Sequence, residues 1–174
     1  GDCTMTSILK VSEIQDPTNS NTALTIDANG YVSGKTISPA FVCRQSADTT
    51  LTSGVFMSLS WTEELDTHSS VSNGVFTVPS GQAGLYHFST GVTVNGIGGG
   101  TFIITTLFLN GSANNLFEVY NPTAITNQAV RQVNIANLSA GDTVEFKVQQ
   151  ASGSNKTTGF IVDRKAFFCG FRLG

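Results

Sequence analysis

Residues 73–96 constrain the fold more than any other part of the chain, because they hold two apolar segments separated by a turn. They read NGVFTVPSGQAGLYHFSTGVTVNG. The proline fixes one φ angle and two of the glycines permit backbone angles that other residues avoid, so residues 75–78 and 85–94 are predicted to be separate strands. In the second segment the large apolar residues follow a two-residue repeat, at Tyr86, Phe88, Val92 and Val94. This period is typical of a half-buried antiparallel strand.

The composition also favours strands over helices. The 174 residues include 18 glycines and 12 phenylalanines, and only 12% of them are charged. Such a mix suits many short strands and turns. The length fits one domain with an additional arm. The net charge of −3 leaves no basic patch that could neutralise a run of phosphates, so nucleic acid is not expected as a partner.

Five short motifs follow one another along residues 39–174. They are PAF at 39–41, FTVPSGQAGLYHF at 76–88, LFLNG at 107–111, LSAGDTV at 138–144 and FCGF at 168–171. In this order they resemble the globular head of complement one-q, a jelly-roll family allied to tumour necrosis factor. The resemblance implies an all-β fold, a two-sheet antiparallel jelly-roll sandwich over residues 39–174. This fold hosts secreted ligands, bacterial proteins and viral fibre heads alike.

The alternation of apolar residues predicts which side chains face the core of this sandwich. The expected core residues are Phe76, Tyr86, Phe88, Phe108, Phe146 and Phe171. The last strand is apolar on both faces, because Phe168 and Gly170 lie opposite Phe171, and such a strand needs a second partner. In the family that the chain resembles, the sheet with the first and last strands lines a threefold axis. We therefore expect a homotrimer with Phe41, Phe168 and Gly170 in its interface.

Residues 5–38 differ from the rest and are predicted to form an N-terminal anchoring arm; residues 1–4 precede the first methionine and are interpreted as an addition before a natural start. The arm has two alternating segments, residues 8–14 and 23–32, and Ala-Asn-Gly at 28–30 predicts a tight hairpin. Its sequence resembles the leading segments of tail-fibre and virion structural proteins of marine phages, which implies docking on a phage capsid or tail protein. The residues expected to make that contact are Ile8, Val11, Ile14, Leu24 and Ile26. The alternative is a flexible linker.

Residues 112–128 are predicted to form a long loop, a common place for recognition on a rigid β-scaffold. The candidate receptor contacts are Phe117, Tyr120 and Asn121, because aromatic rings with amide neighbours stack on sugars and hydrogen-bond to them. The expected partner is a host surface glycan or protein. The alternative is that the two rings pack against the rim of the domain.

No catalytic or metal site is predicted, and no cofactor is expected. Glu63, Glu64 and Asp66 follow the only tryptophan but lack the spacing of a calcium loop, so a solvated turn is favoured over calcium binding. The chain contains no G-x-S-x-G, H-E-x-x-H or P-loop motif. Its two histidines, His68 and His87, are interpreted as surface residues.

The three cysteines, Cys3, Cys43 and Cys169, form no C-x-x-C pair and lack the spacing of zinc ligands. Cys43 and Cys169 are predicted on the neighbouring first and last strands, where two buried thiols are favoured and a disulfide stays open. The apolar runs are too short for a membrane span and no signal peptide opens the chain, so membrane insertion is not expected.

These observations together favour a non-enzymatic phage virion structural protein. We expect a trimeric fibre or capsid decoration on the virion surface, anchored by its N-terminal arm, with the jelly-roll head facing outward. The alternative is a secreted, extracellular, complement-like trimeric module that binds a ligand. An enzyme such as a glycan depolymerase fits least well.

Overall fold

The computed structural model describes residues 13–15, 22–26, 32–34, 38–159 and 166–173. Every helix or strand found in these residues is a β-strand. The chain divides into two compact units, residues 1–37 and residues 38–174, and each is described here by itself.

The first unit contains a three-stranded antiparallel sheet in the order β1-β2-β3. Its strands are β1 (Glu13–Gln15), β2 (Thr22–Ile26) and β3 (Val32–Gly34). Ile26 pairs with Val32 across β2 and β3, which confirms that the chain reverses between these strands as the Ala-Asn-Gly tripeptide predicted. Of the predicted anchoring residues, Ile14 lies in β1 and Leu24 and Ile26 lie in β2, whereas Ile8 and Val11 lie outside the described residues.

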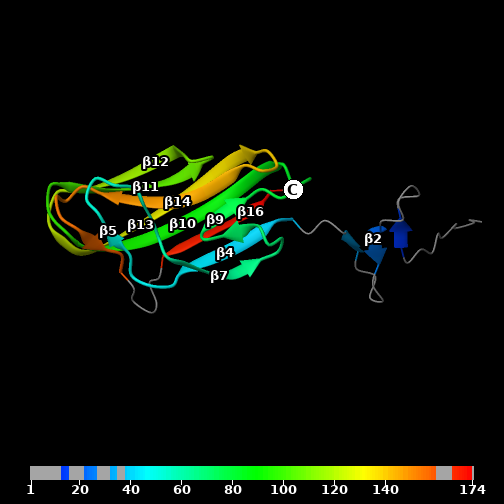
Figure 1. Ribbon diagram of the computed structural model, residues 1–174, viewed down its shortest axis with the longest axis horizontal. Coiled ribbons are helices and arrows are strands. Elements are labelled where there is room, and N and C mark those ends of the chain that lie inside the picture. Colours follow the sequence, from blue (N-terminus) through cyan, green and yellow to red (C-terminus); the bar gives the residue numbers. More distant parts are fainter. Residues whose placement is uncertain (1–12, 16–21, 27–31, 35–37, 160–165, 174) are drawn as a thin grey trace, which may run out of the picture. The chain divides into compact units, whose positions relative to one another are not determined.

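The second unit is the predicted two-sheet antiparallel jelly-roll sandwich (Figure 1). The five-stranded sheet has the order β13-β10-β16-β4-β7, formed by β4 (Ala40–Gln45), β7 (Trp61–Asp66), β10 (Gly84–Ile97), β13 (Ile125–Leu138) and β16 (Phe167–Arg172). The six-stranded sheet has the order β12-β11-β14-β9-β8 with β6 also paired to β14, and comprises β6 (Met57–Ser58), β8 (Val71–Ser72), β9 (Val75–Thr77), β11 (Thr101–Leu109), β12 (Ser112–Asn121) and β14 (Thr143–Gln150). A separate pair consists of β5 (Thr50–Leu51) and β15 (Lys156–Thr157).

The turns between strands follow from residues that tolerate positive φ angles. Asn110 and Gly111, with φ angles of 50° and 78°, join β11 to β12 in the tight turn that an Asn-Gly pair favours. The predicted strand over residues 85–94 is the inner part of β10. As expected, the first and last strands of the jelly roll are neighbours in one sheet. The cyan β4 pairs with the red β16, and the two lie side by side in Figure 1.

An aromatic cluster fills the space between the two sheets. Four of the predicted core residues, Phe76, Tyr86, Phe88 and Phe146, are at most 1% exposed, which confirms their assignment. Phe41 stacks on Phe76 with ring centroids 4.8 Å apart. The Tyr86 hydroxyl, although buried, donates a hydrogen bond to the Gln82 carbonyl oxygen at 2.6 Å, so no polar group is left unpaired there.

The structure reverses the predicted faces of the last strand. Phe168 is 0% exposed and points into the core with Gly170, whereas Phe171 is 45% exposed. Phe41 is also buried, at 1% exposure. The predicted interface residues Phe41, Phe168 and Gly170 are therefore core residues of a single chain, and the predicted core residue Phe171 is not. An alternation that is apolar on both faces does not reveal which face is inward.

Two further predictions were wrong. Residues 112–128 are not a long loop, because β12 and the start of β13 occupy most of them. Phe108 is only partly buried and lies outside the core cluster, where its ring contacts Phe56 at a centroid distance of 5.4 Å.

The two described cysteines cannot form a disulfide in this fold. Cys43 faces the core and Cys169 faces away from it, and both thiols are free. Burial, followed by the nearby carboxylates of Glu63 and Asp66, raises the pKa of Cys43 to about 11. Burial also raises the pKa of Cys169. Both side chains therefore remain protonated thiols at neutral pH.

Candidate functional site

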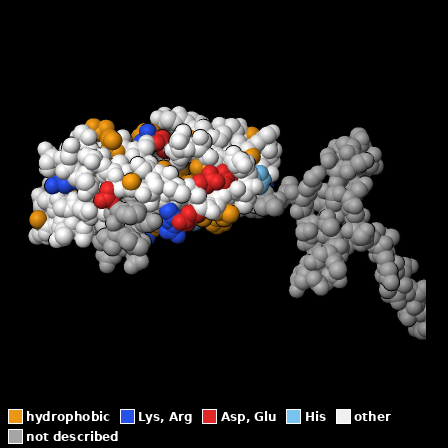
Figure 2. All heavy atoms as spheres, turned by 60° about the horizontal axis from the view of Figure 1, so that its bottom comes forward, with side chains coloured by type: hydrophobic (Ala, Val, Ile, Leu, Met, Phe, Trp, Pro, Cys, Tyr) orange, Lys and Arg blue, Asp and Glu red, His pale blue; other side chains and the backbone are white. Residues whose placement is uncertain are grey.

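The outward side of the five-stranded sheet carries large apolar side chains that the fold leaves exposed. Leu85, Val133, Ile135 and Phe171 are 49%, 62%, 59% and 45% exposed, and Leu65 on the edge strand β7 is 47% exposed. We call these five residues the outer apolar face. Figure 2, which turns the lower side of Figure 1 forward, shows hydrophobic side chains gathered beside a group of charged ones.

The outer apolar face is continuous across strands because of the register of the sheet. His87 on β10 pairs with Ile135 on one side and with Phe171 on the other. The His87 and Phe171 rings lie 4.9 Å apart. In the next row, Ser89 lies between Val133 and Cys169. Monomeric soluble proteins rarely expose large contiguous apolar patches, and such patches usually mark interaction sites.

Charged residues border this face at one end. Phe167 lies over Gly91, where an added Cβ would be only 2.4 Å from the ring. The Arg131 and Arg44 guanidinium carbons lie 5.4 Å and 5.8 Å from the centroid of the same ring. Arg44 also donates to a Glu64 carboxylate oxygen at 3.2 Å. The face therefore combines an apolar centre with a charged border, the arrangement expected of a protein interface.

The predicted receptor residues do not form one surface. Phe117 and Tyr120 are exposed on the edge strand β12, at 43% and 60%, so they do not pack fully against the rim. Their odd spacing places the two rings on opposite faces of the strand. Asn121 is only 4% exposed, so its predicted role as a surface contact is corrected.

A bulge shapes the exposed edge of β12. The register between β11 and β12 shifts around Thr106, and Asn115 has a φ angle of 53°. The Thr106 hydroxyl donates to the Asn114 carbonyl oxygen at 2.7 Å, and the Gln132 amide donates to the Asn115 carbonyl oxygen from the other sheet. These contacts hold the bulge in place, and bulges of this kind interrupt edge-to-edge pairing of strands.

The acidic residues predicted to form a turn lie on a strand, and the two histidines each contact a neighbouring side chain. Glu63, Glu64 and Asp66 lie on strand β7 and not in a turn. In the part of the chain that is described, no cluster of three His, Cys, Asp or Glu side chains could hold a metal ion. His68 is hydrogen-bonded to Thr67 through Nδ1, and His87 contacts Phe171. Both are partly exposed, which agrees with their interpretation as surface residues.

Comparisons with known proteins identify the fold. No protein-family model and no curated protein sequence matches the chain. The globular domain of zebrafish complement 1qA has a TM-score of 0.57 and 18% identity, and the match covers 78% of this chain and 98% of that one. Murine APRIL at pH 5.0 has a TM-score of 0.56 and 13% identity, with 79% and 100% coverage. The likeness confirms the jelly-roll fold that the five sequence motifs predicted.

None of the described residues forms a helix that is long and apolar enough to cross a membrane.

Proposed function

We propose that this protein is a non-enzymatic homotrimeric binding module, and that the trimer forms through the outer apolar face. The supporting observation is the row of Ile135, His87 and Phe171 across three strands, in which Ile135 and Phe171 are exposed and His87 is partly exposed. No described residue of the second unit covers this row. The structural likeness to a complement head adds support, since the expected threefold axis of that family runs along the same sheet. The interface residues proposed from sequence are thus replaced by residues of the opposite face.

We further propose that the chain is a phage virion structural protein, a fibre or capsid decoration on the virion surface. Residues 5–38 would dock on a capsid or tail protein through Ile8, Val11, Ile14, Leu24 and Ile26. This proposal is supported by the resemblance of the arm to phage structural proteins and by the separation of the chain into two units near residue 38. The jelly-roll head would face outward and bind a host surface glycan or protein, with Phe117 and Tyr120 as candidate contacts.

A second candidate function is a secreted, extracellular, complement-like ligand-binding module. The specific observation that favours it is the match to the globular domain of complement 1qA over 98% of that domain. Mass spectrometry of purified virus particles distinguishes the two candidates, because only the virion protein would be present in stoichiometric amounts.

Sedimentation equilibrium tests the trimer directly. The full chain should sediment with three times its mass of 18.3 kDa. The double variant Ile135→Asp, Phe171→Asp should sediment as a folded monomer, because unpaired carboxylates in an apolar interface are costly to desolvate. A monomeric parent protein, or an unaltered trimer in the double variant, would contradict the proposed assembly.

A further inference from the structure

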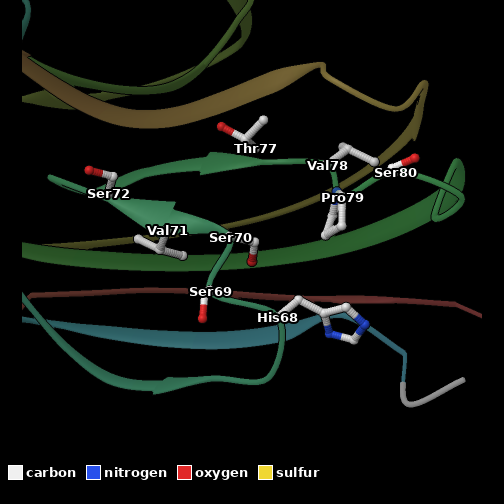
Figure 3. Close-up of a pocket in the computed structure, with 9 residues that line it drawn as sticks. All are labelled: His68, Ser69, Ser70, Val71, Ser72, Thr77, Val78, Pro79 and Ser80. Carbon is white, nitrogen blue, oxygen red and sulfur yellow. The ribbon is translucent and has the colours of Figure 1, made fainter. Parts of the chain in front are cut away.

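A pocket of about 370 Å³ lies at the margin of the six-stranded sheet, away from the outer apolar face. One wall is formed by residues 68–72, which comprise the connection from β7 and β8 itself, and the other by residues 77–80, which begin with the last residue of β9 (Figure 3). Nothing described so far assigns it a role. Its volume falls in the range of small-ligand sites.

The first wall is held rigidly by Asp66. Its carboxylate accepts hydrogen bonds from the backbone N–H of His68 at 3.0 Å and of Val71 at 2.7 Å, and from the Ser70 hydroxyl at 2.9 Å. Burial opposes ionisation, but these hydrogen bonds outweigh it and lower the pKa of Asp66. Ser69, in the middle of the wall, has a φ angle of 50°, a conformation that non-glycine residues rarely adopt. Such backbone persists only where surrounding contacts hold it.

The second wall is hydrogen-bonded both to the first wall and to the turn between β13 and β14. The Thr77 N–H donates to the Ser70 carbonyl oxygen at 2.8 Å, which joins the two walls. The Val78 N–H donates to the Asp142 carbonyl oxygen, and the Gly141 N–H donates to the Val78 carbonyl oxygen, both at 2.9 Å. The shape of the pocket therefore exists before any ligand binds, which reduces the entropy lost on binding.

The lining is neutral and rich in hydroxyl groups. Ser69, Ser72, Thr77 and Ser80 line the pocket, and their hydroxyls make no hydrogen bond to any described residue. The lining contains no Lys, Arg, Asp or Glu, and the Asp66 carboxylate behind it is already engaged. Val71 and Pro79, which are partly exposed, and the His68 ring add apolar surface to the lining, whereas Val78 is buried in the core. These groups offer neither an anion nor a cation a charged partner.

We propose that this pocket binds a neutral saccharide residue. Serine and threonine hydroxyls both donate and accept hydrogen bonds, as the hydroxyls of a sugar require, and the partly exposed Val71 and Pro79 side chains can contact its C–H groups. The inference deepens the proposed binding function by naming a ligand class and a place on the head. It does not depend on the trimer, since no residue of the outer apolar face lines the pocket.

The test is a titration of the full chain with the methyl glycosides of glucose, galactose, mannose and N-acetylglucosamine, followed by NMR amide shifts. At least one glycoside should shift the amides of Ser69, Ser72 and Thr77 with saturation. Thr77→Val removes one hydroxyl at nearly constant shape and should weaken binding about threefold to tenfold. Ser72→Phe fills the pocket and should abolish the shifts. Leu116→Ala truncates an exposed side chain on β12, at the opposite edge of the six-stranded sheet, and should leave the shifts unchanged.

Several results would overturn the proposal. These are the absence of saturable shifts with all four glycosides, equal shifts in the Ser72→Phe variant, or larger shifts at the pocket with inorganic phosphate than with any sugar. Shifts confined to β12 would move the glycan site to Tyr120, which keeps the proposed function and removes the pocket. The sedimentation mass and melting temperature of each sample show separately whether the assembly and the fold are intact.

Discussion

Gly170 on β16 lies so close to Phe88 on β10 that a Cβ at position 170 would be 2.6 Å from the Phe88 Cδ1 atom. The same Cβ would be 2.8 Å from Cε1 of Phe41. The absence of a side chain at this position is therefore what allows two aromatic rings to meet under the last strand.

Gly170→Ala should lower the free energy of unfolding by about 1–3 kcal/mol, because the added methyl group overpacks the core. Urea denaturation measures the change. Gly98→Ala is the matched control, since a Cβ there would have no neighbour within 4 Å, and it should change stability much less. Equal effects of the two substitutions would show that the Phe88 and Phe41 rings can move aside at little cost in stability.

Phe168→Asp and Phe171→Asp should have different effects although the residues are close in sequence. Phe168 is 0% exposed, so a carboxylate there would be buried without a partner and the head should fail to fold. Phe171 is 45% exposed, so its variant should keep the circular dichroism of the parent and lose only the trimer. If Phe168→Asp gave a folded monomer, the face assignment of β16 would be wrong.

Phe88→Ala should cost about 3–5 kcal/mol, because it removes a ring that is 0% exposed and leaves a cavity between the sheets. Thermal unfolding followed by circular dichroism gives the comparison. Phe117→Ala, which truncates a 43% exposed ring on β12, serves as the control and should melt close to the parent. Equal melting of the Phe88→Ala variant and the parent would contradict the packing of the core.

Asp66 should make the stability of the head depend on pH in the acidic range. Because its pKa is lower in the folded chain than its ordinary value of 3.8, its ionised form favours folding. This contribution is complete above 3.8 and is lost as the pH falls through the folded pKa. Asp66→Asn should destabilise the head at neutral pH. In this variant the urea concentration at the midpoint of unfolding should fall less steeply as the pH is lowered. If the urea midpoint fell as steeply in the variant as in the parent, other carboxylates would be responsible for the loss of stability in acid.

Deletion of residues 1–37 should leave the head folded and trimeric, because the division into two units falls at residue 38 and the aromatic core described for the second unit is built from residues beyond it. The truncated protein should no longer co-sediment with virus particles that lack this chain, whereas the full chain should. Equal binding by both forms would place the anchor in the jelly roll. Loss of folding in the truncated protein would mean that the arm is part of the head.

Local signals in the sequence were sufficient to predict several strands and turns of the head, but not all of them. Asn110-Gly111 and the proline and glycine cluster around residue 79 act through their own backbone angles, so they mark turns wherever the chain goes. The two-residue period of β10 is also visible in the sequence, because large apolar residues alternate there with small or polar ones. The polar edge strand β12 has no such contrast, so its sequence predicts a loop.

The sequence by itself determined that this chain forms antiparallel strands with a jelly-roll order, because periodicity, turn residues and short motifs are local properties. Only the tertiary structure decided which side of β16 is buried. Both sides of that strand are apolar, and the choice depends on Phe41 and Phe88, which reach Gly170 from neighbouring strands. The same is true of the pocket at residues 68–72 and 77–80, whose walls meet through Asp66, Ser70 and Thr77. Contacts between strands that are distant along the chain, and not the pattern within one strand, determine such surfaces.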